Sequence, residues 1–160
     1  MAVDRDQALL VQISPLTVEV ERGRLRFFAQ SIGETDPIYT DLETALAAGH
    51  RDLPVPPTFF FSLSLERRPE PFAYLVELGV DMNHILHGEQ AFEYHQMAYA
   101  GDTLTLTEAV TDASVKRGGA RSLITRTTEV HRGDEHIATC RTIIVALHPE
   151  NEPIQEAVSA

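Results

Sequence analysis

The sequence predicts an α+β domain in which a curved antiparallel sheet wraps around one central buried helix. Three observations carry this prediction. Apolar residues recur at helical spacing before residue 80, they alternate at strand spacing after it, and one short run, residues 59–65, is apolar nearly all round. The 160 residues fit a single domain, 1–160, with its core at about residues 15–148 and short flexible ends.

Glycines and prolines divide the first half into short elements. Val18 and Val20 alternate with glutamates and predict a short strand. Residues 25–32 and 40–46 predict two helices, each followed by a glycine at which a helix can end. Three prolines between residues 53 and 58 stop any helix there and predict an ordered elbow.

The apolar run at residues 59–65 predicts the buried helix, which Thr58 can cap. From residue 84 to residue 147, alternation predicts four long strands separated by glycine-containing turns. Strands joined in succession by short turns are antiparallel, and one face of their sheet needs an apolar cover. The buried helix provides that cover, which is the hotdog arrangement, and the strand at Val18 completes the sheet at an edge.

Composition and charge exclude several classes of protein. Lys and Arg number 13 against 24 Asp and Glu, a formal net charge of −11, which opposes binding to nucleic acid. The single cysteine, Cys140, cannot form an internal disulfide and is expected to be a small buried thiol. The sequence has no signal-peptide pattern and no apolar run of ~20 residues, so we expect a cytoplasmic protein that does not enter a membrane.

One segment carries a motif. Gly33-Glu34-Thr35-Asp36-Pro37-Ile38-Tyr39, followed by Asp41 and Ala45, resembles the hydratase motif of the MaoC-like dehydratases, which reads Gly-Asp-x-Asn-Pro-aliphatic-His with a downstream Asp and Ala. The resemblance continues in three further blocks: residues 55–59, residues 86–90, and residues 94–95 followed by 100–104. Together they resemble the branch known as the N-terminal half of MaoC-like dehydratases, over roughly residues 18–147.

The resemblance implies a hotdog domain that acts on acyl thioesters of coenzyme A or acyl carrier protein, with no other cofactor. In complete members of the family, an Asp and a His assist reversible addition of water across the 2,3 double bond of an enoyl thioester. Carboxylate and imidazole suit this reaction, because it needs one base and one acid that exchange protons near neutral pH. The implied activity is that of an (R)-3-hydroxyacyl-thioester dehydratase or enoyl-thioester hydratase of fatty acid metabolism.

The sequence departs from the motif at its catalytic positions. The alignment places Glu34 at the catalytic Asp, Asp36 at the Asn and Tyr39 at the catalytic His. A tyrosine, with an ordinary pKa of ~10, is a poor base at neutral pH. Either other residues of this chain supply the acid and base, or the chain is a subunit whose catalytic pair comes from a related partner. Asp36 and Tyr39 remain catalytic candidates. The alternatives are that Asp36-Pro37 forms an ordinary turn and that Tyr39 only packs against its neighbours.

His87 and Glu89 are the candidates for a replacement acid–base pair. Residues two apart on a strand face the same way, so the imidazole and the carboxylate can cooperate, and Gly88 lets a ligand approach the backbone. The alternative is a surface pair beside a β-bulge. If His87 is the acid or base, its replacement by alanine should lower turnover by ~10² to 10⁴.

The predicted substrate contacts lie in the motif loop, at the start of the buried helix and on the strand after residue 84; they are Glu34, Pro57, Thr58, Gly88 and Gln90. We expect free N–H groups at the helix start to polarise the thioester carbonyl. We do not expect His84, His87 and His95 to bind a metal. On one regular strand His84 and His87 face opposite ways, and His95 lies ~26 Å from His87 along the strand.

Three functions remain open at this point. The chain is a dehydratase or hydratase, or a subunit of one; it is a non-catalytic acyl-thioester-binding subunit of a heterodimeric dehydratase; or it is a hotdog thioesterase. An exposed sheet edge predicts pairing with a second hotdog subunit in each case, as a homodimer or a heterodimer.

Overall fold

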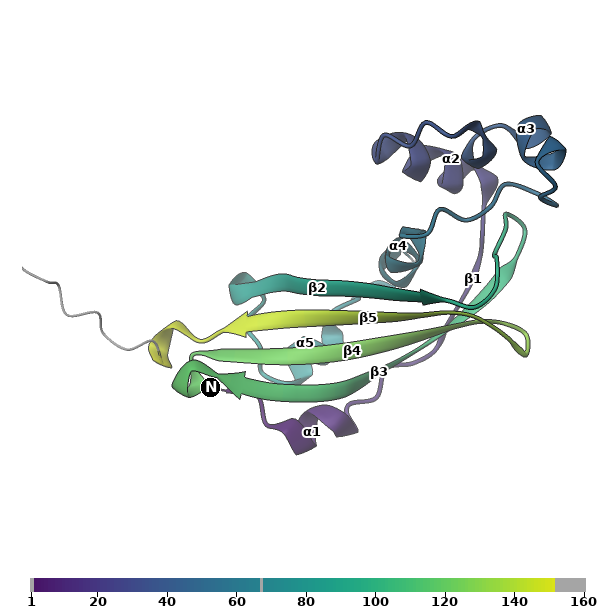
Figure 1. Ribbon diagram of the computed structural model, residues 1–160. Coiled ribbons are helices and arrows are strands. Elements are labelled where there is room, and N and C mark those ends of the chain that lie inside the picture. Colours follow the sequence, from purple (N-terminus) through teal and green to yellow (C-terminus); the bar gives the residue numbers. More distant parts are fainter. Residues whose placement is uncertain (1, 67, 152–160) are drawn as a thin grey trace, which may run out of the picture.

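A five-stranded antiparallel sheet forms the centre of the protein in a computed structural model, which describes residues 2–66 and 68–151. Its strands lie in the order β1-β3-β4-β5-β2. They are β1 (Leu16–Glu19), β2 (Ile85–Tyr94), β3 (Thr103–Lys116), β4 (Arg121–Arg132) and β5 (Glu135–Leu147). The predicted sheet, with its edge strand near Val18, is confirmed (Figure 1).

The helices are short: α1 (Arg5–Leu10), α2 (Arg22–Ser31), α3 (Leu42–Ala47), α4 (Phe59–Glu66) and α5 (Ala73–Glu77). The three predicted helices correspond to α2, α3 and α4. With six and five residues, α1 and α5 are too short to show a helical period in the sequence. In the N-terminal segment, which the sequence predicts to be a short flexible end, Val3 and Ala8 are buried. Residue 1 and residues 152–160 lie outside the described residues.

The buried helix α4 packs on the inner face of the sheet. Phe59 and Phe60 of α4 pack into one apolar cluster with Leu104 on β3. In a second apolar cluster, Leu75 of α5 and Ala8 of α1 pack on the sheet. Within the described ranges, no helix has the length and apolar character needed to cross a bilayer.

A belt of buried polar side chains separates the two apolar clusters. On β3, Leu106 belongs to the first cluster, Glu108 follows, and Val110 belongs to the second. The Glu108 carboxylate lies 2.8 Å from Nη2 of Arg68 and 3.4 Å from Nη1 of Arg126. We call these three charged residues the buried ion triad.

The connection between β2 and β3 crosses from one side of the sheet to the other. The predicted turn near residue 101 does not join neighbouring strands, because β2 pairs with β5 while β3 pairs with β4 and β1. Residues 95–102 lie against the proline elbow instead. Val55 N–H donates to the Ala98 carbonyl and Ala100 N–H donates to the Leu53 carbonyl, each at 2.9 Å. The elbow and this crossover therefore form one unit beside the end of β2.

Candidate functional site

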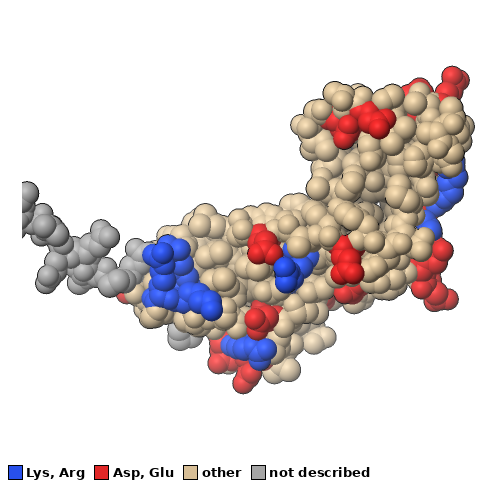
Figure 2. Space-filling model, in the orientation of Figure 1, with Lys and Arg blue, Asp and Glu red and all other residues tan. Residues whose placement is uncertain are grey.

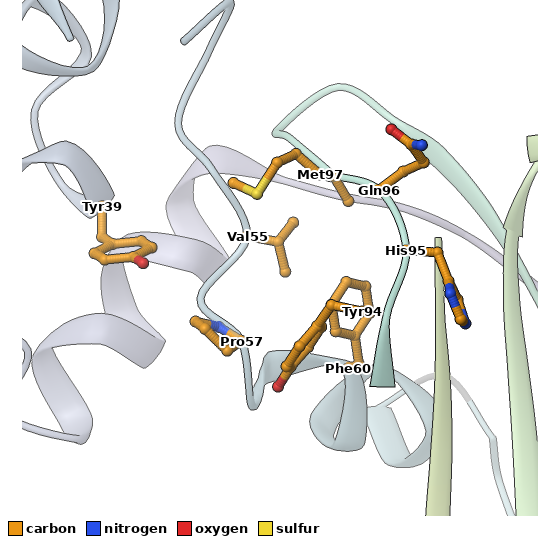
Figure 3. A pocket seen from close by; sticks show the side chains of 9 residues that line it. Tyr39, Val55, Pro57, Phe60, Tyr94, His95, Gln96 and Met97 are labelled. Atoms are coloured by element: carbon orange, nitrogen blue, oxygen red, sulfur yellow. The ribbon is translucent and has the colours of Figure 1, made fainter. Parts of the chain in front are cut away.

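A mainly apolar pocket of about 380 Å³ opens where the motif loop, the proline elbow and the end of β2 meet. Its lining comprises Tyr39, Val55, Pro57, Phe60, Tyr94, His95, Gln96, Met97 and Ala98 (Figure 3). The volume lies in the range of small-molecule sites. Two of the predicted site residues, Tyr39 and Pro57, line this pocket.

The two acidic residues of the motif loop are used to shape the loop itself. Oε1 of Glu34 accepts the backbone N–H groups of Thr35 and Asp36 at 2.8 and 2.9 Å. Oδ1 of Asp36 accepts the N–H of Ile38 at 3.0 Å and so caps the 3₁₀ turn Pro37–Tyr39. The Asp-Pro segment therefore forms an ordinary turn, which was one of the alternatives that the sequence left open. Neither carboxylate lines the pocket.

Tyr39 occupies the motif position of the catalytic histidine. Partial burial raises the pKa of its phenol, and the negative charges of Glu34 and Asp36 raise it further. The group therefore stays protonated at neutral pH, where it can donate a hydrogen bond but cannot act as a base. The motif loop supplies no acid–base pair of the usual kind.

The expectation that His87 and Glu89 face the same way is wrong. The strand pairing shifts between these two residues, because Gly88 is an extra residue in a β-bulge. His87 lies opposite Ile144 and its ring stacks on Phe61 of α4, with the centroids 5.1 Å apart. Glu89 lies on the other face of the sheet and forms an exposed ion pair with Arg141 at 3.0 Å. The two side chains cannot act as one pair, and neither lines the pocket.

Gly88 is required by the neighbouring strand. A Cβ atom at this position would lie 2.8 Å from Cγ2 of Val145 and 3.2 Å from the Ile143 carbonyl oxygen. The close approach of β5 therefore explains why residue 88 is a glycine. The sequence alone instead predicts the approach of a ligand at this position. Gln90, two residues on, accepts a hydrogen bond from the Thr142 hydroxyl at 2.7 Å and also lies outside the pocket lining.

We expect Gly88→Ala to lower the free energy of unfolding by about 1 to 3 kcal/mol, because the added methyl overpacks the contact between β2 and β5. Urea denaturation followed by circular dichroism measures the change. Gly23→Ala is the matched control, since nothing lies within 4 Å of a Cβ there and the residue is helical. It should be neutral or stabilising by up to about 1 kcal/mol; equal effects at both positions would contradict the packing explanation.

The start of α4 offers fewer free N–H groups than predicted. Phe59 N–H already donates to the Pro56 carbonyl at 2.9 Å, and Phe61 N–H donates to the Thr58 carbonyl at 3.2 Å. Thr58 itself is exposed and is absent from the pocket lining. Of the predicted helix-start residues, Pro57 alone contacts the pocket.

The three histidines considered for metal binding have separate surroundings. Nδ1 of His84 lies 2.9 Å from Asp81, and His87 stacks on α4. The His95 ring lies 4.1 Å from the ring of His136. Across the described residues, no three His, Cys, Asp or Glu side chains are arranged to hold a metal ion. Cys140 is buried as predicted, and burial raises the pKa of its thiol to about 12.

Sequence reasoning missed the pocket wall at the end of β2. Tyr94 and Phe60 project into the pocket, whereas the His95 imidazole points to the opposite side of the strand (Figure 3). Phe92 and Tyr94 are two residues apart on one strand and so share a face, which is a sequence signal that could have identified Tyr94 as an inward-facing residue. No sequence signal marks Gln96 or Met97, because they reach the pocket through the crossover.

Comparison with known proteins places the chain in a family. Residues 9–140 match the family described as "FAS1-like, dehydratase domain region", and the chain belongs to this family. It is 36% identical over 144 residues to the UPF0336 protein SCO4636 of Streptomyces coelicolor. The match covers 88% of this chain and 94% of that protein.

Two solved structures share the fold. The chain matches a structure of the HadBC (3R-hydroxyacyl-ACP dehydratase) complex of Mycobacterium tuberculosis with a TM-score of 0.69 and 22% identity, covering 83% of this chain and 92% of that one. It matches a MaoC-like dehydratase with a TM-score of 0.72 and 25% identity, covering 88% of this chain and 42% of that longer chain. The hotdog fold and the relation to MaoC-like dehydratases, both predicted from the motif blocks, are confirmed.

Proposed function

We infer that this chain is the acyl-thioester-binding subunit of a two-chain (R)-3-hydroxyacyl-thioester dehydratase or enoyl-thioester hydratase. Its thioester carrier is coenzyme A or acyl carrier protein, and a second hotdog subunit supplies the acid and the base. The observation that carries this proposal is Tyr39, a protonated phenol on the pocket wall at the motif position of the catalytic histidine.

The chemistry of the pocket supports binding more than proton transfer. Removal of water from a 3-hydroxyacyl thioester requires a base for the proton next to the carbonyl and an acid for the leaving hydroxyl. Of the nine described residues that line the pocket, none is Asp or Glu, and the imidazole of His95 points away from it. The apolar walls can hold an acyl chain, while the proton-exchanging groups must come from elsewhere.

The open edge of the sheet supports a second subunit. Among the strands in the described residues, β2 pairs on one side only, with β5, and it carries half-exposed Leu86 and Tyr94. Figure 2 shows that the part containing α2 and α3 stands above the long body of the molecule, which leaves a step beside β2. A strand added along β2 would satisfy this edge and cover the mouth of the pocket. The HadBC structure that this chain matches is itself a dehydratase complex.

Partner-dependent turnover tests this proposal. The purified 160-residue chain should not hydrate crotonyl-coenzyme A, and should do so once combined with a MaoC-like hotdog chain that carries an intact Asp and His motif. Replacing that partner's Asp and His should abolish the activity. Hydration by this chain alone would overturn the proposal, and cleavage of the thioester would favour the hotdog thioesterase.

His87→Ala separates the proposal from the hypothesis of an internal catalytic pair. We expect the two-chain assembly to keep its turnover within about threefold, because His87 stacks on Phe61 outside the pocket. An internal pair predicts a loss of ~10² to 10⁴ instead. Circular dichroism of the variant checks that it is folded. A loss of the larger size in a folded variant would restore His87 as the acid or base.

A further inference from the structure

One wall of the pocket is irregular backbone from the crossover that follows β2. Gln96, Met97 and Ala98 line the pocket there, and none of them belongs to a helix or a strand. Figure 3 shows the Met97 side chain reaching from this segment toward Val55. The shape of the pocket therefore depends on the contacts that hold this backbone in place.

The guanidinium of Arg132, the last residue of β4, contacts this backbone directly. Its Nη1 donates to the Met97 carbonyl at 3.1 Å and to Oδ2 of Asp102 at 2.7 Å. Its Nε donates to Oε2 of Glu135, the first residue of β5, at 2.9 Å. Among the described residues, Arg132 is the one hydrogen-bond donor to the Met97 carbonyl. Arg132 thus ties the pocket wall to the end of the β4–β5 hairpin.

Arg132 supports the wall from behind and does not reach the pocket. Its side chain is 26% exposed and is absent from the pocket lining. Asp102, its main partner, is 5% exposed, and a charge-assisted hydrogen bond to a buried carboxylate is stronger than a neutral one. The Arg132–Asp102 pair is therefore a firm support to which the Met97 carbonyl is attached.

The three contacts require an arginine. Nη1 serves two acceptors while Nε serves a third, so the guanidinium uses two edges of its planar fork at once. A lysine at this position keeps the positive charge beside Asp102, but its ammonium is a compact point charge without that fork. It can replace the ion pair but not the whole set of contacts.

We propose that Arg132 is a positioning residue for the acyl thioester, which fixes the pocket wall at Met97 without touching the substrate. This inference rests on the proposed function and names a residue outside the pocket that sets its affinity. Because the acid and the base come from the partner chain, Arg132 acts on substrate binding and not on the chemical step.

Arg132→Lys in the assembly with the hotdog partner tests the proposal. Calorimetry should show that butyryl-pantetheine binds about 3- to 10-fold more weakly. With crotonyl-coenzyme A, KM should rise by a similar factor while kcat stays within about twofold, which is the signature of lost uniform binding. Hydrogen exchange should become faster at the Val55 and Ala100 amides, whose hydrogen bonds join the elbow to the crossover.

Two control variants separate this role from a general loss of stability. Arg5→Lys makes the same chemical change in an exposed ion pair with Asp112. Ser122→Ala destabilises the protein elsewhere, because the buried Ser122 hydroxyl bonds to the Val3 N–H and to His148. Both variants should bind butyryl-pantetheine as the wild type does.

Wild-type affinity in Arg132→Lys, an equal loss in Ser122→Ala, or a fall in kcat at unchanged KM would overturn the inference, as would undetectable binding of butyryl-pantetheine by the wild-type assembly. Its failure is distinguishable from failure of the proposed function. Turnover by the assembly with an affinity that does not depend on Arg132 refutes only this inference. Arg132-dependent binding in an assembly that does not turn over refutes only the proposed function.

Discussion

Replacing Glu108 with alanine should lower the free energy of unfolding by about 3 to 5 kcal/mol, because it leaves two cations in the interior without their counter-ion. The Glu108 side chain is fully buried, and those of Arg126 and Arg68 are 3% and 14% exposed. The carboxylate also accepts a hydrogen bond from the Thr128 hydroxyl at 3.1 Å. Urea denaturation of the folded variant, followed by circular dichroism, measures the loss.

Glu89→Ala is the matched control for this prediction. Glu89 pairs with Arg141 at 3.0 Å, but both side chains are more than half exposed. Replacing Glu89 with alanine should lower the free energy of unfolding by less than about 1 kcal/mol. Replacing Glu108 and Arg126 together by leucine should recover part of the loss, since one unpaired cation then leaves the core with the carboxylate. Similar costs for Glu108→Ala and Glu89→Ala would show that the buried ion triad contributes no more than a surface pair.

Features that depend on neighbouring residues could be predicted from the sequence. Gly33 and Gly49 end α2 and α3 with positive φ angles of 72° and 91°. Asp41 caps α3 by accepting the Thr44 N–H at 2.7 Å. Tyr39 of the motif loop lines the pocket, and the turn that ends at Tyr39 is built from contacts within a few residues.

Features that depend on a distant strand could not be predicted in the same way. The pattern His87-Gly88-Glu89 is compatible with a regular strand, and only the contact of Gly88 with Val145 on β5 shows why a bulge forms. Because of this one extra residue, His87 faces α4 while Glu89 faces the other side of the sheet. The two side chains therefore do not form the predicted pair. The pocket wall at Gln96 and Met97 likewise exists because the chain crosses the sheet after β2, which no local pattern reveals.

Asp102 anchors this crossover, and Asp102→Ala should lower the free energy of unfolding by about 2 to 4 kcal/mol. Its buried carboxylate accepts hydrogen bonds from Arg51, from Arg132 at 2.7 Å and from the backbone N–H of Tyr99 at 2.9 Å. Loss of the carboxylate removes all three bonds next to the pocket wall at Ala98. Asp112→Ala is the control, because Asp112 forms an exposed pair with Arg5 and should cost less than about 1 kcal/mol.

The pH dependence of stability distinguishes this anchor from simple loss of packing. Burial by itself would raise the pKa of Asp102, but hydrogen bonds from Arg51, the Tyr99 N–H and Arg132 lower it below the ordinary value. A lowered pKa in the folded state means that the stabilisation is fully present above the unfolded pKa of ~3.9 and is lost as the pH falls through the folded pKa. The difference between wild type and Asp102→Ala should therefore be constant from pH 7 to about pH 5 and shrink below about pH 4. A difference that stays the same down to the acid transition would show that the charge of Asp102 does not hold the crossover.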